Sequence, residues 1–137
     1  METTLEQFLE QWTDDETGMR TFFGQLQSYL VKQSNVSLDF KARPGISYSL
    51  RAKHAQQKKR DLYVLIDVID DEPDERWLSI CFYAESLSEE LQEHGDVVPA
   101  GLMGEDACCF DISEHDEDFE AILFACLDSA YTFASAE

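Results

Sequence analysis

The chain has 137 residues, a length at which one compact domain is expected, so residues 1–137 are predicted to form a single domain. Hydrophobic residues make up 44% of the chain and charged residues 28%, a composition that excludes a largely disordered protein. The formal net charge is −19, which excludes ordinary DNA or RNA binding through the whole surface, because affinity for nucleic acids comes mostly from basic side chains.

Two amphipathic helices are predicted near the N-terminus, at residues 3–12 and from about 15 to 33. Each begins at a sequence that fits a capping box, in which a hydroxyl side chain and a carboxylate satisfy free backbone N–H groups. The two capping boxes are Thr3 with Glu6 and Thr13 with Glu16. Apolar residues of the second helix recur at helical spacing on one side, namely Met19, Phe22, Phe23, Leu26, Tyr29 and Leu30. This side is expected to pack on a sheet.

The hydrophobic period then changes from 3.6 to 2, which predicts a β-hairpin with strands at 36–42 and 46–54. A two-residue turn at Pro44-Gly45 would set Phe40 opposite Ser49 and mix the two faces of the sheet. A three-residue turn that includes Ile46 sets Phe40 opposite Leu50 and keeps the faces separate. The longer turn, or a bulge, is therefore predicted.

Two more strands are predicted at 62–69 and 77–84, and together with the hairpin they give an antiparallel meander. Ser86 with Glu89 predicts a short helix, residues 97–104 are expected to form a glycine-containing loop, and residues 108–112 are a candidate fifth strand. Ser113 or Asp116 is expected to cap a last amphipathic helix. The predicted fold class is α+β, an antiparallel four- to five-stranded sheet with the N-terminal and C-terminal helices packed on one face.

The segments FKARPGISYSLRA, LYVLIDVID and WLSICFYA follow an amphipathic helix, and this order over residues 15–84 resembles the bacterial YdhG-like domains of unknown function. The resemblance implies an α+β fold and carries no site residues. The size, the low pI and the order of helix, sheet and helix are also similar to the acidic, dimeric chaperones of bacterial type III secretion. The helix expected between the third and fourth strands of those chaperones is missing here.

A basic segment at residues 41–60 interrupts the acidic chain. It holds seven Lys or Arg residues and no acid, which gives it a charge of +7 and leaves −26 for the rest. If the three-residue turn holds, four of these cations share one face of the hairpin, namely Lys41, Arg43, Arg51 and Lys53. They are the candidate anion-binding residues; the alternative is a solvated sheet face whose cations pair with neighbouring acids, such as Asp39 with Arg51.

The other residues that could act in catalysis or metal binding are predicted to have structural roles. The acidic run from Asp111 to Asp118 has no metal-site spacing, and acids at a helix N-terminus complement the helix dipole. The adjacent pair Cys108 and Cys109 would need a histidine within hydrogen-bond reach to act as a nucleophile. No catalytic residue, no metal site and no cofactor are predicted.

The cellular location is predicted to be the cytoplasm. The N-terminus lacks the features of a secretory signal, and no stretch approaches the roughly 20 apolar residues that cross a bilayer, so no membrane association is expected. The four cysteines form no C-x-x-C motif and are expected to be reduced thiols.

The leading functional hypothesis is a non-catalytic bacterial domain for protein interaction or regulation, with a protein partner. The alternatives are an acidic chaperone of the secretion type and a small hydrolase or thiol enzyme. A homodimer is also predicted, because Phe124 and Phe133 lie outside the main apolar stripe of the last helix and are candidates for a two-fold interface.

Overall fold

The computed structural model describes residues 3–137. Its helices are α1 (Leu5–Gln11), α2 (Met19–Val31), α3 (Glu89–Gln92) and α4 (Glu117–Ser135), with a 3-10 turn η1 (Ala84–Ser86). Its strands are β1 (Val36–Arg43), β2 (Ser47–His54), β3 (Val64–Ile69), β4 (Trp77–Tyr83), β5 (Asp96–Leu102) and β6 (Glu105–Ile112). Among these residues, none of the helices combines the length and the apolar composition needed to cross a membrane.

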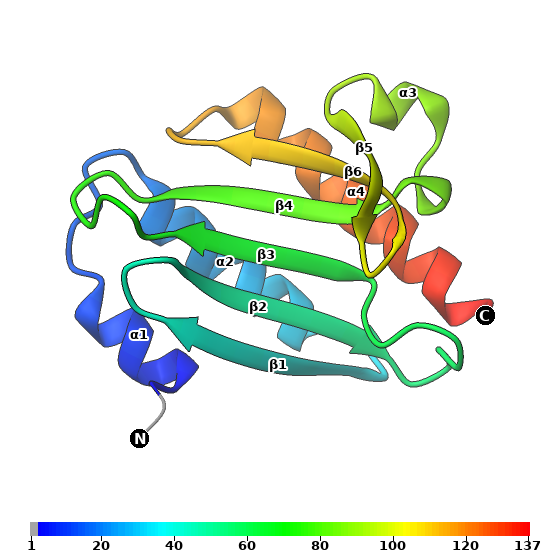
Figure 1. The fold of residues 1–137 in the computed structure, drawn as a ribbon, viewed down its shortest axis with the longest axis horizontal. Helices are drawn as coiled ribbons and strands as arrows, with labels where there is room; N and C mark the ends of the chain where they lie inside the picture. Colours follow the sequence, from blue (N-terminus) through cyan, green and yellow to red (C-terminus); the bar gives the residue numbers. More distant parts are fainter. Residues whose placement is uncertain (1–2) are drawn as a thin grey trace.

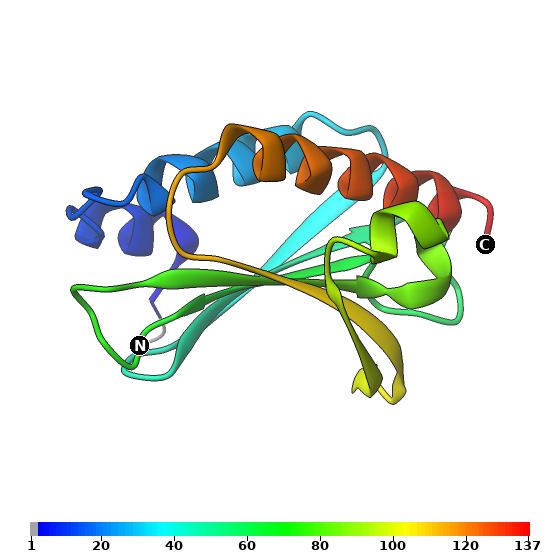
Figure 2. The same ribbon diagram turned by 90° about the horizontal axis from the view of Figure 1, so that it is seen from above.

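The sheet has six strands in the order β1-β2-β3-β4-β6-β5, and every neighbouring pair is antiparallel. The predicted α+β class is confirmed, with six strands instead of four or five. Figure 2 shows α1, α2 and α4 together on one side of the sheet, whereas the β5–β6 hairpin projects to the other side. Figure 1 is seen from the uncovered side, which we call the open face.

The hydrophobic core lies between the sheet and the helices. Inward-facing residues of β2, β3, β4 and β6 are fully buried against the apolar sides of α2 and α4. Phe8 of α1 stacks on Tyr48 of β2 with ring centroids 4.0 Å apart, which joins α1 to the same core. Because the apolar residues alternate along each strand, the polar residues between them are left on the open face.

The register of the first hairpin confirms the three-residue turn. Arg43 pairs with Ser47, Phe40 pairs with Leu50, and Pro44, Gly45 and Ile46 form the turn. Gly45 has a φ of 85°, a left-handed conformation that glycine adopts without a steric penalty. The turn is held from outside by Asp70, whose carboxylate accepts a hydrogen bond from the Gly45 N–H at 2.9 Å.

The predicted helix starts were wrong by one to several residues. The first capping box consists of Thr4 and Gln7, one residue later than predicted, because the Gln7 amide takes the role expected of Glu6. Helix α2 begins after Gly18, and the Asp15 carboxylate accepts the Thr21 N–H of its first turn at 3.0 Å, so the predicted box at Thr13 does not form. The short helix α3 is capped by Ser88, not by Ser86, whose hydroxyl donates to the Tyr83 carbonyl.

The segment predicted as a loop at 97–104 is mostly strand β5. It pairs with β6 at Val97 and Val98, and the register shifts between Val98 and Leu102. Pro99 and Gly101 within this bulge hid the strand, because both residues are unfavourable inside regular strands. The candidate strand at 108–112 is confirmed and begins earlier, at Glu105.

Candidate functional site

The four predicted cations lie together on the open face. Lys41 and Arg43 are on β1, and Arg51 and Lys53 are on β2. In the observed register Lys41 pairs with Ser49, and Arg51 pairs with Asp39, so their side chains point to the same side of the hairpin. We call these four residues the basic strip.

The register arranges the basic strip as a diagonal line. Arg43 and Lys41 are two residues apart on β1, and the next position on that side of β1, Asp39, lies opposite Arg51. Lys53 follows two residues further along β2. Two residues of a strand span about 7 Å, so the four cations recur about every 7 Å along the strand direction. The first two lie on β1 and the last two on β2.

Most of the basic strip is free of intramolecular ion pairs. Lys41 and Arg43 are exposed. Of the four residues of the basic strip, only Lys53 makes an ion pair within residues 3–137, with Asp61 at 3.7 Å. The expected pair of Asp39 with Arg51 does not form, although the two residues face each other. Arg51 is half-buried, and its Nε atom is buried without a hydrogen-bond partner among the described residues. A buried donor without a partner is costly. Because Nε itself is closed to solvent, an acceptor from outside would have to bind the rest of the guanidinium.

Beyond the basic strip, the open face carries two aspartates. A cross-strand row continues from Ser49 through Asp67 and Ser79 to Asp111. Asp67 accepts a hydrogen bond from the Ser49 hydroxyl. The open face therefore carries the basic strip on β1 and β2 and two aspartates further along the sheet, on β3 and β6.

Arg60, also in the basic segment, has a different environment. Its guanidinium donates to Glu105 at 2.6 and 2.9 Å and to Glu85, and it lies over the rings of Tyr83 and Phe133. The hydrogen bond from Arg60 lowers the pKa of Glu105, and burial raises the pKa of Tyr83 to about 12. Arg60 therefore joins the loop after β2 to β6 and α4 and is not available for a ligand.

The side chain of Glu137 closes the same cluster. Its Oε1 atom accepts hydrogen bonds from the backbone N–H groups of Lys58, Lys59 and Arg60, at 3.3, 2.8 and 3.2 Å. Burial opposes ionisation of this carboxyl, and the three N–H groups outweigh that effect and lower its pKa. The +7 segment is thus divided into the basic strip and a separate loop that already holds a carboxylate.

A second buried ion pair was missed by the sequence analysis. Arg76 donates to Asp70 at 2.7 Å, and both side chains are almost fully buried, with 12% and 5% of their surface exposed. The guanidinium lies 5.3 to 5.5 Å from the ring centroids of Phe8, Trp12 and Tyr48. This pair fixes the turn of the first hairpin beneath α1.

The prediction that all four cysteines are reduced was wrong for two of them. Cys81 of β4 and Cys109 of β6 occupy directly opposite positions and form a disulfide on the open face. The pair was hidden because 28 residues separate the two cysteines, so only the β4–β6 register brings them together. Cys108 and Cys126 are free and buried, and burial raises the pKa of Cys126 to about 12. The cytoplasmic location stays a prediction.

The residues considered for catalysis and metal binding have structural surroundings. Within residues 3–137, no histidine hydrogen-bonds to Cys108 or Cys109; the Cys108 thiol instead contacts the Gln92 carbonyl at 3.8 Å. His115 is 2.7 Å from Glu120, and Asp116 is the N-cap of α4, as predicted. The described part of the chain contains no group of three or more His, Cys, Asp or Glu placed to hold a metal ion.

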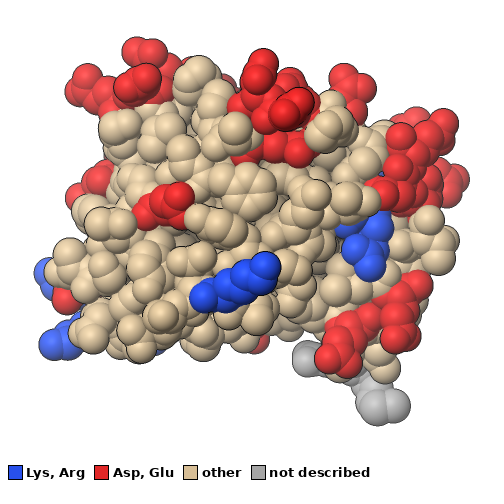
Figure 3. Space-filling view, turned by 180° about the vertical axis from the view of Figure 1, so that it is seen from behind, with Lys and Arg blue, Asp and Glu red and all other residues tan. Residues whose placement is uncertain are grey.

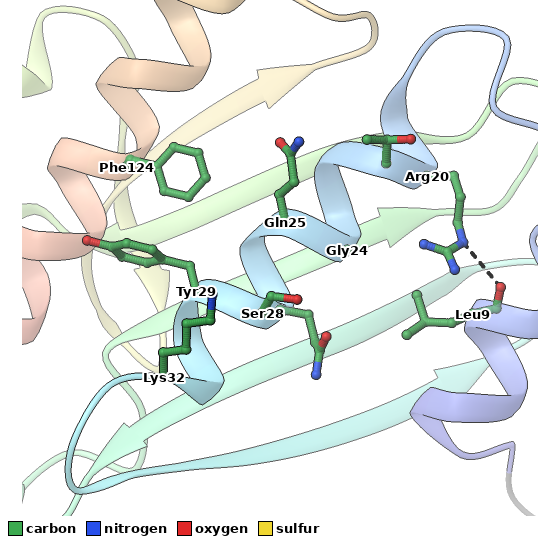
Figure 4. Close-up of a pocket in the computed structure, with 10 residues that line it drawn as sticks. Leu9, Arg20, Gly24, Gln25, Ser28, Tyr29, Lys32 and Phe124 are labelled. Atoms are coloured by element: carbon green, nitrogen blue, oxygen red, sulfur yellow. Dashed lines mark hydrogen bonds between the residues drawn. The ribbon is translucent and has the colours of Figure 1, made fainter.

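The helix side of the molecule carries a shallow depression between α1, α2 and α4, of about 660 Å³. Figure 4 shows its lining, in which the Arg20 guanidinium donates to the Leu9 carbonyl at 3.1 Å. Polar residues of α2 such as Gln25, Ser28 and Lys32 make up most of the lining. Figure 3 shows this side with acidic groups along much of its rim and a few Lys and Arg groups between them, and the lining of the depression includes Arg20 and Lys32.

The aromatic residues proposed for a dimer interface, Phe124 and Phe133, make contacts within the chain. The Phe124 ring packs edge-on against Phe22 and Tyr29 of α2, at centroid distances of 6.0 and 5.1 Å. Phe133 lies beneath the Arg60 guanidinium. Both side chains are half-buried by these contacts, and a dimer through α4 stays a prediction.

Comparison with known proteins gives no relative: no family model matches the chain, and neither a curated protein nor a solved structure matches it.

Proposed function

We propose that this protein is a non-catalytic interaction domain whose basic strip binds an extended, acidic segment of a protein partner. The observation that supports the proposal most strongly is the diagonal line of Lys41, Arg43, Arg51 and Lys53, in which only Lys53 has an ion pair within residues 3–137. Unpaired cations on a surface of net negative charge attract anions without any need for a catalytic group.

The spacing of the basic strip favours a peptide in the β conformation. Side chains of an extended peptide that point to one side also recur every two residues, at about 7 Å. A segment with Asp or Glu at every second position would therefore place one carboxylate near each cation. Arg51 lies near the middle of the line, and a charge-assisted hydrogen bond to its guanidinium is about twice as strong as a neutral one.

The remaining charge of the molecule limits the partner further. Asp67 and Asp111 of the open face lie within reach of any broad ligand centred on the sheet. A nucleic acid duplex would meet those carboxylates at distances comparable to the Debye length of about 8 Å. A single extended peptide over β1 and β2 would avoid them.

Peptide binding tests the proposal directly. We expect a synthetic peptide in which Glu and Ala alternate to bind the wild-type protein, with an affinity that falls as salt is added. Replacing Arg43 and Arg51 by Ala should reduce the affinity about tenfold, because two charge pairs are lost. Fluorescence anisotropy with a labelled peptide measures both effects.

Two controls make this result specific. The variant Lys58→Ala/Lys59→Ala removes the same charge from exposed side chains outside the basic strip and should bind like the wild type. A peptide of the same composition with adjacent Glu residues should bind more weakly than the alternating peptide. Equal affinity of the two double variants would show that net charge, and not the basic strip, controls binding.

A further inference from the structure

The two edges of the sheet are built differently. Edge strand β5 contains Pro99, Gly101 and a register shift, features that prevent another strand from pairing with it. The opposite edge, β1, has eight residues and pairs with β2 without interruption from Val36 to Arg43. It contains neither proline nor glycine, and Figure 1 shows it at the border of the sheet.

The outer backbone groups of β1 can be identified from the ladder. The Asn35 carbonyl accepts a hydrogen bond from the Ala55 N–H at 2.8 Å, and antiparallel ladders alternate between bonded and non-bonded pairs. The odd-numbered residues of β1 therefore bond to β2. The N–H and C=O groups of Leu38, Phe40 and Ala42 point outward, away from the sheet. The side chains of these three residues are only half-buried, because no strand lies beyond them.

The charges of β1 are complementary to a second copy of the same strand. If two β1 strands pair antiparallel about a two-fold axis at Phe40, Leu38 lies opposite Ala42 of the second copy, and the outward groups form hydrogen bonds. Asp39 then lies opposite Lys41 of the second copy, and by symmetry this contact occurs twice. A register shifted by two residues in either direction would instead place Asp39 opposite itself or Lys41 opposite itself.

We infer that the protein forms a homodimer by antiparallel pairing of β1 with β1 of a second copy, in the register that joins Asp39 to Lys41. The two sheets become one continuous sheet, and Asp39 lies between Arg51 of its own chain and Lys41 of the other. An interface of one strand pair is small, so the dimer is a transient one that forms at high micromolar concentration.

Charge reversal tests both the interface and its register. Sedimentation velocity of the wild type should show a species of twice 15.7 kDa at high micromolar concentration. Asp39→Lys sets lysine opposite lysine, and Lys41→Asp sets aspartate opposite aspartate, so each variant alone should dimerise at least about tenfold more weakly. An equimolar mixture of the two variants should restore the dimer, because the introduced lysine of one chain then faces the introduced aspartate of the other.

Both substituted side chains are exposed, so the variants should keep the circular dichroism spectrum and melting temperature of the wild type. Lys58→Asp, a reversal at an exposed lysine outside β1, should leave the dimer unchanged. A wild type that stays monomeric, single variants that still dimerise, or a mixture that stays monomeric would each overturn the inference. None of these results depends on peptide binding, so the dimer and the proposed function stand or fall separately.

Discussion

Asp70 is a buried carboxylate whose charge is balanced by one side chain, Arg76, and whose second oxygen accepts the Gly45 N–H. Replacing Arg76 by Ala leaves this charge buried without a counterion. We expect the free energy of unfolding to fall by about 3 kcal/mol, the lower end of the range for broken buried pairs, because part of the Arg76 side chain is exposed. Urea denaturation measures the change.

The matched control for this prediction replaces both partners. The variant Asp70→Asn/Arg76→Met has no unpaired charge and should be more stable than Arg76→Ala. If Arg76→Ala unfolds at the same urea concentration as the wild type, the pair does not fix the turn of the first hairpin.

Glu105 makes the stability of the fold depend on pH, and the direction of this dependence follows from the pKa of Glu105. The hydrogen bond from Arg60 lowers this pKa in the folded state below the ordinary value of 4.5. Ionised Glu105 therefore stabilises the fold above pH 4.5, and the stabilisation is lost as the pH falls through the lowered pKa. The variant Glu105→Gln should lose less stability than the wild type on acidification, as followed by urea midpoints over a pH series.

A glutamate without an ion pair serves as the comparison for this experiment. Glu90 of α3 is exposed and makes no ion pair within the described residues 3–137. Glu90→Gln should show the pH dependence of the wild type. If Glu105→Gln shows it as well, the contact with Arg60 does not contribute to stability.

These residue-scale clusters could not be predicted from the sequence. Arg60 meets Glu85 and Glu105 across 25 and 45 residues, so only the folded sheet brings the three side chains together. In the sequence, Arg60 belongs to the basic segment, and residues 70–76 lie between two predicted strands. Nothing in these two segments of the sequence indicates that Arg60 and Arg76 are buried beside aromatic rings.

At the scale of the elements, the Cys81–Cys109 disulfide ties β4 to β6. It closes a loop of 28 residues, for which the loss of chain entropy in the unfolded state predicts a stabilisation of about 3.5 kcal/mol. Cys81→Ser/Cys109→Ser should be less stable by about that amount. In denaturant without a reductant, thiol labelling should detect two of the four cysteines, and after reduction it should detect all four.

Thiol labelling can also contradict the disulfide. Labelling of all four cysteines before reduction would show that Cys81 and Cys109 are thiols in the purified protein. The stability of the serine variant would then report only the change of side chain.

The elements with a strong hydrophobic period were predictable, and those without one were not. Alternation in residues 36–54 was sufficient to choose the three-residue turn and to place Phe40 opposite Leu50. Strand β5 has no such alternation, because nearly all of its residues are exposed and Pro99 interrupts it. The start of α2 was misplaced because Gly18 reverses the chain there, and the hydroxyl of Thr13 caps nothing.

At the scale of the whole molecule, the fold divides the basic segment at 41–60 between the open face and the loop that holds Arg60. The open face holds the basic strip on β1 and β2, and the helix side shows acidic groups at its rim (Figure 3). The four residues of the basic strip were predictable because the hairpin register was predictable. The lack of an ion pair at Arg51 was not predictable, since Asp39 lies opposite Arg51 in the hairpin register and yet makes no ion pair with it.

The most direct test of the basic strip as a binding site is an NMR titration of the ¹⁵N-labelled protein with the alternating Glu-Ala peptide. We predict that the amide shifts that change are those of β1 and β2, with the largest changes around Arg43 and Arg51, and that added salt reverses them. Changes confined to the depression between α1, α2 and α4, or no changes at peptide concentrations at which anisotropy reports binding, would contradict the proposal.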